Sequence, residues 1–411
     1  MARQEPLVKQ TGFAGINNVL KPENTPPEFL KEAVNVDIDK AGNIHKRDGY
    51  SLVSAGNYQS IWANGDLCYA VKDNDLIRIN ADYTESTLKP DTGALDFTEL
   101  NGLIYFTSDT ANGVIDNGVV REWGIDIPNP PTLSKVSGLL PAGDYQVTYT
   151  WIRPDGMESG APVASVITVP DSSGISVTIP VSGYDARVYA SNHNGTELFY
   201  SGDSQSGMKF FITSVSKLSN PLKMFNLARA PYGETPAYFK GRVYICDGNS
   251  VWYSEPLQYE HFNLDSNYLD MEHKVIGLMP VDDGMWIATE GGLYFAFGTN
   301  PFNLMLKEAA VMVKGTNAVI PMSYLKQSTG YFVAITTDKG VFLLGNTGYC
   351  GNLTSTNLSL EKASTGTAEF VEQSGANQYI SILKKTGEPN NSVFGDIVSS
   401  EIIRNGVALP N

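Results

Sequence analysis

The fold of this 411-residue chain is indicated by the stretch Lys240-Gly-Arg-Val-Tyr-Ile-Cys246, continued by Asp247-Gly-Asn-Ser-Val-Trp-Tyr253. A polar turn containing glycine leads into a strand, and a second such turn leads into a second strand. This pattern predicts a β-hairpin. Five other places in the chain begin in the same way, and the last of them is a looser copy. Their glycines are Gly65, Gly102, Gly284, Gly330 and Gly375.

The spacing of these glycines predicts the architecture. Successive repeat starts, with Gly241 included, lie 37, 139, 43, 46 and 45 residues apart. A period in the forties with two or more strands per unit is typical of a β-propeller, and six starts predict six blades. The gap of 139 residues exceeds one period by about 94 residues, which is the size of one sandwich domain.

The long gap has the sequence of an all-β insertion. Strand-like segments with alternating apolar and polar residues follow the stiff linker Pro128-Asn-Pro-Pro131, and turns separate them every 8–12 residues. We therefore expect an Ig-like or fibronectin-like β-sandwich without a disulfide, since the insertion contains no cysteine. The predicted units are an arm with a short helix and a hairpin (1–57), the first propeller part (58–128), the sandwich (129–229) and the second propeller part (230–411).

Two details concern the ends of the chain. Thr25-Pro-Pro-Glu28 followed by Phe29 and Leu30 predicts a two-turn helix capped by Thr25. Propeller closure is expected to pair a strand from Asn43–Val53 with the last blade near Glu401–Val407. Removal of residues 131–228 is expected to leave a folded propeller.

Charge and composition exclude several classes. The net charge is −15, and residues 129–229 are neutral, so the whole excess of carboxylates lies on the rest of the chain. A chain this acidic is not expected to bind nucleic acid. The start has no signal-peptide pattern and no apolar run is long enough to span a membrane. Three scattered cysteines fit a reducing cytoplasm and predict buried thiols: Cys68, Cys246 and Cys350.

No motif for catalysis stands out. The chain lacks a nucleophile elbow, a P-loop and a dinucleotide fingerprint, and its histidines (His45, His193, His261 and His273) have no metal-site spacing. We therefore assign no catalytic, metal or cofactor-binding residue. Asp37–Gly42 faintly resembles a calcium loop and Asp338 a sialidase Asp box, but a hairpin turn is favoured for both. Strand aromatics predict packing between blades, with sugar stacking as the alternative: Trp62, Trp252, Tyr253 and Trp286.

A family resemblance covers most of the chain. Gly12-Phe-Ala-Gly-Ile-Asn-Asn18 and the stretch from Leu30 to Tyr50, which contains Ala33-Val-Asn-Val-Asp-Ile-Asp39, look like the opening of tailed-bacteriophage virion proteins. The run from Gly241 to Pro256 and the stretch Ala142–Thr150, with Asp155-Gly-Met-Glu-Ser-Gly160, are similar to the same group. The resemblance implies a tail nozzle or tail tube β-propeller protein of the short-tailed type.

The resemblance also implies partners and a location. Such a protein would form a ring, expected to be a hexamer, below the portal and adaptor. It would contact tail tube proteins and tail fibres or spikes, and genomic DNA would pass without specific binding. The chain would assemble in the host cytoplasm and reside in the virion tail, with no enzymatic activity. Two alternatives remain at this stage: a carbohydrate-binding propeller for host-surface recognition, and a glycoside hydrolase.

Overall fold

A computed structural model provides the structure of the chain. It describes residues 12–13, 15–31, 36–38, 43–46, 51–214, 219–298, 303–320, 330–354, 358–360, 363–373, 376–385 and 400–405. These residues form strands and short 3-10 helices, with no α-helix among them. Within the described ranges, no helix is long and apolar enough to cross a membrane.

Six antiparallel sheets follow one another along the chain and form the six blades of a β-propeller. Five of them have four or five strands and the last has three. Blades 1 to 3 consist of β5 (Tyr58–Asn64), β6 (Leu67–Lys72), β7 (Asp75–Ile79) and β8 (Glu85–Lys89); β9 (Asp96–Leu100), β10 (Leu103–Thr107), β11 (Asn112–Asp116) and β12 (Val119–Arg121); and β21 (Glu234–Phe239), β22 (Arg242–Asp247), β23 (Ser250–Glu255), β24 (Gln258–Phe262) and β25 (Tyr268–Asp270).

Blades 4 to 6 continue the pattern. Their strands are β26 (Val275–Pro280), β27 (Gly284–Thr289), β28 (Gly292–Phe297) and β29 (Leu304–Glu308); β30 (Ala318–Ile320), β31 (Phe332–Thr337), β32 (Gly340–Leu344) and β33 (Cys350–Asn352); and β34 (Ala363–Gln373), β35 (Ala376–Lys385) and β36 (Ser400–Asn405). A short 3-10 helix, η3 (Asn346–Gly348), lies between β32 and β33. The six-bladed propeller predicted from the glycine spacing is confirmed.

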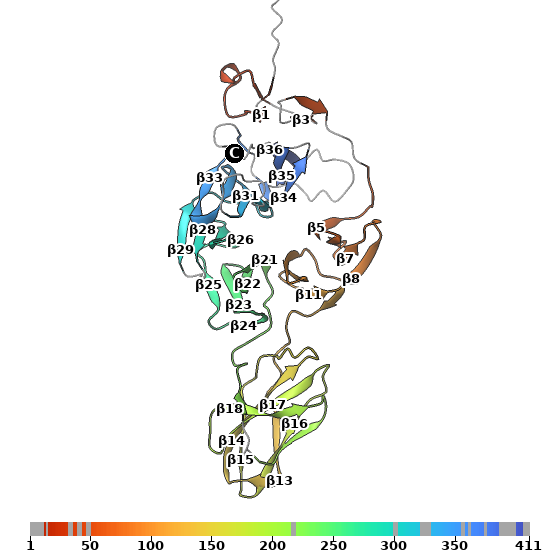
Figure 1. Cartoon of the computed structure of the whole chain (residues 1–411), viewed down its shortest axis with the longest axis vertical. Helices are drawn as coiled ribbons and strands as arrows, with labels where there is room; N and C mark the ends of the chain where they lie inside the picture. The colour runs from red at the N-terminus through yellow and green to blue at the C-terminus, as the bar shows by residue number, and fades with distance from the viewer. Residues whose placement is uncertain are drawn as a thin grey trace, which may run out of the picture.

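Three of the repeat glycines, Gly65, Gly102 and Gly241, lie in the turns between the first and second strands of their blades, and Gly284 is the first residue of β27. Gly65, Gly102 and Gly241 have φ values of 56°, 78° and 83°, in the left-handed region that glycine adopts without strain. Each predicted hairpin therefore corresponds to the second and third strands of a blade. The blades surround a common axis in Figure 1.

Apolar clusters between successive blades hold the propeller together. Tyr69 and Leu76 of blade 1 pack against Ile104 and Phe106 of blade 2, and four similar clusters join blades 2 to 3, 3 to 4, 4 to 5 and 5 to 6. The clusters form because alternate strand residues point into the space between neighbouring sheets. Each blade is thus stabilised mainly by the blades next to it.

The insertion forms two sheets that pack as a β-sandwich below the propeller in Figure 1. One sheet has the order β13-β16-β19 and the other β15-β14-β17-β18-β20. Tyr145, Tyr149 and Val188 lie in the buried core between them. β16 pairs with β13, and β17 pairs with β14, so strands that are not consecutive in the chain lie side by side. Ig-like sandwiches have Greek-key connections of this kind. Its strands are β13 (Thr132–Leu140), β14 (Gly143–Ile152), β15 (Ser165–Val169), β16 (Ser173–Thr178), β17 (Asp185–Ser191), β18 (Leu198–Ser204), β19 (Lys209–Ile212) and β20 (Ser219–Pro221).

The predicted helix at Thr25 is wrong. A 3-10 helix, η1 (Pro22–Asn24), comes earlier, and Thr25 is its C-cap. Phe29–Leu30 forms β2, which pairs in parallel with β1 (Gly15–Ile16). Two successive prolines disfavour helical backbone at the residues before them, and the pairing with β1 satisfies the following backbone groups.

The predicted closure is also not found among the described residues. There, β4 (Ile44–Lys46) pairs with β3 (Val36–Ile38), and β36 pairs with β35. Instead, the Asn18 side chain bonds to both the N–H and the carbonyl of Ser359, at 2.7 and 2.9 Å. The N-terminal arm therefore contacts the segment before blade 6 through a side chain, which strand patterning does not reveal.

Candidate functional site

Most motifs considered for chemistry have structural roles. Among the described residues, no group of three or more His, Cys, Asp or Glu side chains is arranged to hold a metal. Asp338 lies in the turn between β31 and β32, where its Oδ1 accepts the N–H of Val311 at 2.8 Å. The strands β3 and β4 form a hairpin around residues 39–42, which lie outside the described residues. Both were predicted as hairpins.

The strand aromatics pack against other residues of the blades. Trp286 is fully buried between blades 4 and 5, and Tyr253 is buried between blades 3 and 4. Trp62 is half-buried against Tyr69 and Phe97, and Trp252 lies beside Tyr268 with ring centres 5.0 Å apart. This confirms packing for these four residues.

The three cysteines differ in exposure. Cys246 is buried, whereas Cys68 and Cys350 are only half-buried, so the expectation of three buried thiols holds for one of them. Burial raises the pKa of Cys246 to about 12 and that of Cys350 to about 11. Both thiols are therefore unreactive at neutral pH.

The most unusual polar residues of the chain lie where the sandwich meets the rim of blade 3. Glu260 on β24 is buried, and it accepts two parallel hydrogen bonds from the Arg153 guanidinium of the sandwich, at 3.1 and 3.2 Å. Arg121, at the end of β12, approaches the same carboxylate at 2.8 Å. A buried carboxylate with two cations joins blade 2, blade 3 and the sandwich, so its geometry fixes their relative positions.

A second set of contacts lies beside this one. The buried His261 bonds through Nε2 to the carbonyl oxygen of Glu158, at 2.6 Å. Because a carbonyl only accepts, Nε2 carries the proton. The Glu158 carboxylate bonds in turn to Arg187, Tyr189 and Thr150 of the sandwich sheet. Burial, with Glu158 as a second cause, raises the pKa of the Tyr189 hydroxyl well above its usual range.

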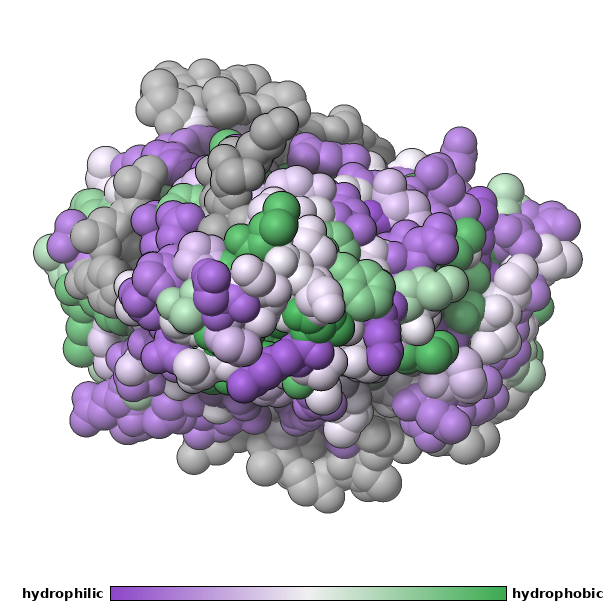
Figure 2. All heavy atoms as spheres, turned by 90° about the horizontal axis from the view of Figure 1, so that it is seen from below, coloured by the Kyte–Doolittle hydropathy of each residue, from purple (hydrophilic) through white to green (hydrophobic). Residues whose placement is uncertain are grey.

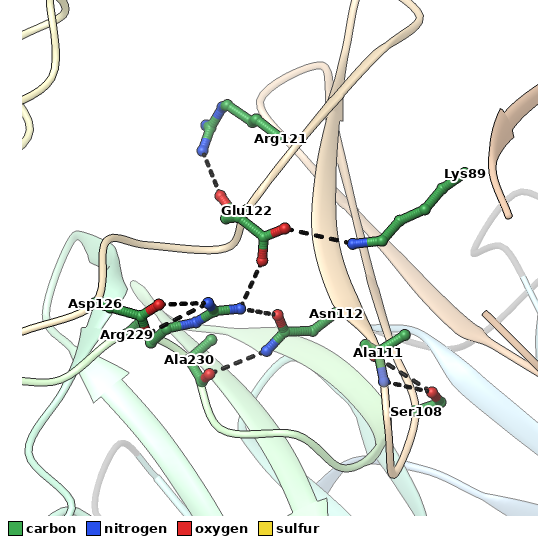
Figure 3. A network of polar contacts seen from close by, with 9 residues as sticks. All are labelled: Lys89, Ser108, Ala111, Asn112, Arg121, Glu122, Asp126, Arg229 and Ala230. Atoms are coloured by element: carbon green, nitrogen blue, oxygen red, sulfur yellow. Dashed lines mark hydrogen bonds and ion pairs between the residues drawn. The ribbon is translucent and has the colours of Figure 1, made fainter. Parts of the chain in front are cut away.

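Two linkers connect the propeller and the sandwich: the outgoing linker (122–131) and the returning linker (222–233). They contact each other and blade 2 (Figure 3). Arg229 of the returning linker contacts Glu122 of the outgoing linker at 2.8 Å and Asn112 of β11 at 2.7 Å. Asn112 donates back to the carbonyl of Ala230 at 3.0 Å. The buried Trp123 donates through Nε1 to the carbonyl of Tyr259 at 2.8 Å. The linkers thus act as packed parts of the propeller.

Ion pairs link residues at the starts of the first strands of blades 3, 4 and 5. Glu234 at the start of β21 contacts Lys314, which precedes β30, at 2.7 Å, and Lys274, which precedes β26, at 3.8 Å. Asp96 at the start of β9 accepts the N–H of Thr235 at 2.8 Å. One Glu–Lys pair thus joins blade 3 to blade 5, which are not consecutive in the chain.

Little in the sequence indicates this junction. Arg153, Glu260 and His261 are far apart in the chain, and each occupies an ordinary turn or strand position. The one available signal was Arg153-Pro-Asp-Gly156, a turn that places a cation at the end of β14. Only the folded sandwich shows which surface this cation meets.

Comparisons with known proteins identify no family. No protein-family model and no curated protein matches the chain. Solved structures that are similar to it include BBS1N in complex with ARL6DN (11% identity, covering 80% of this chain and 91% of that chain, TM-score 0.34). Virginiamycin B lyase from Staphylococcus aureus has 10% identity, with 80% and 93% coverage and a TM-score of 0.33. Kluyveromyces lactis Hsv2 has 8% identity, 80% and 90% coverage and the same TM-score.

These likenesses do not extend to function. The similar structures are β-propeller-like, and one of these three is a lyase. With TM-scores this low, the six-bladed architecture rests on the sheets and clusters described above, and the likeness assigns no activity to this chain.

Proposed function

We propose that the chain is a non-catalytic structural subunit of a bacteriophage tail, assembled as a ring in the tail nozzle or tube. The observation that carries this proposal is the buried junction of Glu260, Arg121 and Arg153, which holds the sandwich at a fixed position on the propeller rim. A ring subunit needs such a fixed shape, because small errors in angle accumulate from copy to copy and prevent closure. The likeness of residues 12–50 to virion proteins supports the same role.

The charge distribution supports a path for DNA that does not bind it. The net charge of −15 lies outside the neutral stretch 129–229. Phosphates are repelled by carboxylates within about 8–10 Å at physiological salt, so only residues on the channel wall contribute. Since the Glu234–Lys314 pair joins the first strands of blades 3 and 5 within one copy, the proposed path is the lumen between copies in the ring.

The test is electron cryo-microscopy of the purified protein and of virions, combined with DNA binding at low salt. We expect closed rings whose lumen is lined mainly by carboxylates, and no submicromolar affinity for duplex DNA. A lumen lined by Lys and Arg, or tight DNA binding, would refute the conduit. Release of sugar from host polysaccharide would refute the non-catalytic role.

A further inference from the structure

Leu257 occupies a turn position that disfavours its side chain. It lies with Pro256 between β23 and β24, and its φ of 59° is in the left-handed region. The equivalent turn of blade 2 uses Asn117 and Gly118, which tolerate such angles. The Leu257 side chain is also 73% exposed, so burial does not compensate for the strain. Neither backbone preference nor packing within the monomer explains a leucine here, which indicates a role outside the monomer.

The residues around Leu257 have the composition of a protein interface. Tyr238 is exposed and contacts the half-buried Tyr259 edge to face, with ring centres 6.0 Å apart. Lys240 is exposed beside them, and Arg242 follows on β22. Within the part of the chain that the structure describes, no ion pair joins either cation to a carboxylate. We call Leu257, Tyr238, Tyr259 and Lys240 the Leu257 knob; tyrosine is among the residues enriched in interface hot spots.

A pocket suited to such a knob lies on blade 1. Its volume is about 440 Å³, and it is lined by residues 51–56 and by Tyr58, Ile79, Tyr83 and Glu85. Leu52, Val53 and Tyr83 are each at least 60% exposed, and Tyr83 is a second bulky residue with left-handed backbone, at φ 64°. The apolar side chains of the pocket are thus exposed to water, and a leucine and a tyrosine from a partner would cover them.

The charges near the two surfaces are complementary. Two carboxylates, Asp82 and Glu85, and one cation, Lys72, lie around the pocket, and Lys72 contacts Glu85 at 2.6 Å. Two cations, Lys240 and Arg242, and one carboxylate, Glu255, lie around the knob. The pocket therefore has one excess carboxylate and the knob one excess cation. In contrast, the sandwich end of the molecule shows mainly hydrophilic residues with separate hydrophobic patches (Figure 2).

We infer that the Leu257 knob of one copy of this chain inserts into the blade 1 pocket of a second copy. Knob and pocket lie on different blades, and a single knob seated in a single pocket is a head-to-tail contact that leaves one free knob and one free pocket at the ends of every open oligomer. Contacts of this kind close into a ring when the rotation between copies closes and give an open filament otherwise, and the proposed ring requires closure. The inference rests on the proposed function, since it names the contact that would build the ring.

The test uses two full-length variants and sedimentation velocity. Leu257→Gly removes the knob and suits the φ of the turn, so the monomer should fold at least as well as the wild type. Leu52→Asp disables the pocket at an exposed position. We expect each variant alone to self-associate about tenfold more weakly or worse, the loss typical of a hot spot. An equal mixture should give heterodimers and no rings, because one intact knob then meets one intact pocket.

The control is Val181→Ser, at an 89% exposed position on the sandwich, which should assemble like the wild type. Wild-type assembly by the Leu257→Gly variant, or a mixture without heterodimers, overturns the knob-and-pocket contact alone. A wild-type chain that stays monomeric at every concentration overturns the proposed ring, and with it this contact.

Discussion

Glu260 is the single residue on which the junction depends most. It is buried and contacts both Arg121 and Arg153, so its replacement leaves two guanidinium groups without their carboxylate. We expect Glu260→Gln to lower the free energy of unfolding by about 3 kcal/mol, as breaking a buried ion pair does. Urea denaturation followed by tryptophan fluorescence measures this loss.

The matched control is Glu308→Gln, the same change in an exposed pair with Lys339. That pair should contribute less than about 1 kcal/mol. Equal effects of the two substitutions would show that Glu260 does not hold the junction together.

Asp96 gives a prediction about pH. Burial raises the pKa of its carboxyl group, and the N–H of Thr235 and the charge of Lys314 offset this only in part. The folded state therefore binds the proton more tightly than the unfolded chain, and ionised Asp96 opposes folding as pH rises above the ordinary value of about 3.9. Asp96→Asn keeps an acceptor for Thr235 and removes the charge.

We expect the Asn variant to be more stable than the wild type at pH 7, with the difference shrinking as pH falls toward 4. Thermal denaturation at several pH values measures this difference. A difference that does not change with pH would contradict a raised pKa for Asp96.

At the scale of elements, the segment after β14 passes closely against the returning linker. Ala161 donates its N–H to the carbonyl of Met224 at 2.9 Å, and a Cβ added to Gly160 would lie 1.7 Å from the carbonyl oxygen of Leu227. We expect Gly160→Ala to push these segments apart and to lower the melting temperature of the protein. Gly183→Ala is the control, since its added Cβ meets nothing within 4 Å. Similar melting temperatures for the two variants would contradict close packing at Gly160.

The same scale shows why local patterns succeed for hairpins and fail for the arm. A hairpin is specified by its own turn, so the glycine turns at Gly65 and Gly241 were sufficient to predict two strands each. The segment after Thr25 has good capping residues for a helix. Its actual partner is β1, about a dozen residues earlier, and a parallel pairing leaves no signal in either segment alone.

At the scale of the whole molecule, the structure shows that the deletion that removes the sandwich needs other boundaries than residues 131–228. Ala228 pairs with Phe262 of blade 3 through two backbone hydrogen bonds, of 2.8 and 2.9 Å, so it belongs to the propeller. We expect deletion of residues 128–226, bridged by a short Gly-Ser linker, to leave a folded β-propeller with a lower melting temperature, because Glu260 loses Arg153. Circular dichroism during heating tests this. Loss of the β signal at 20 °C would show that the propeller needs the sandwich to fold.

Short-range patterns in the sequence are sufficient to predict the repeating part of this protein. Blade number, the place of the insertion and the all-β class follow from glycine turns and alternating residues, which act over a few positions along the chain. The tertiary structure alone decided which distant residues meet: Arg153 with Glu260, Glu234 with Lys314, and Asn18 with Ser359. Such contacts depend on how rigid blades and sheets pack around one another, and a side chain at an ordinary strand or turn position does not reveal its partner until that packing exists.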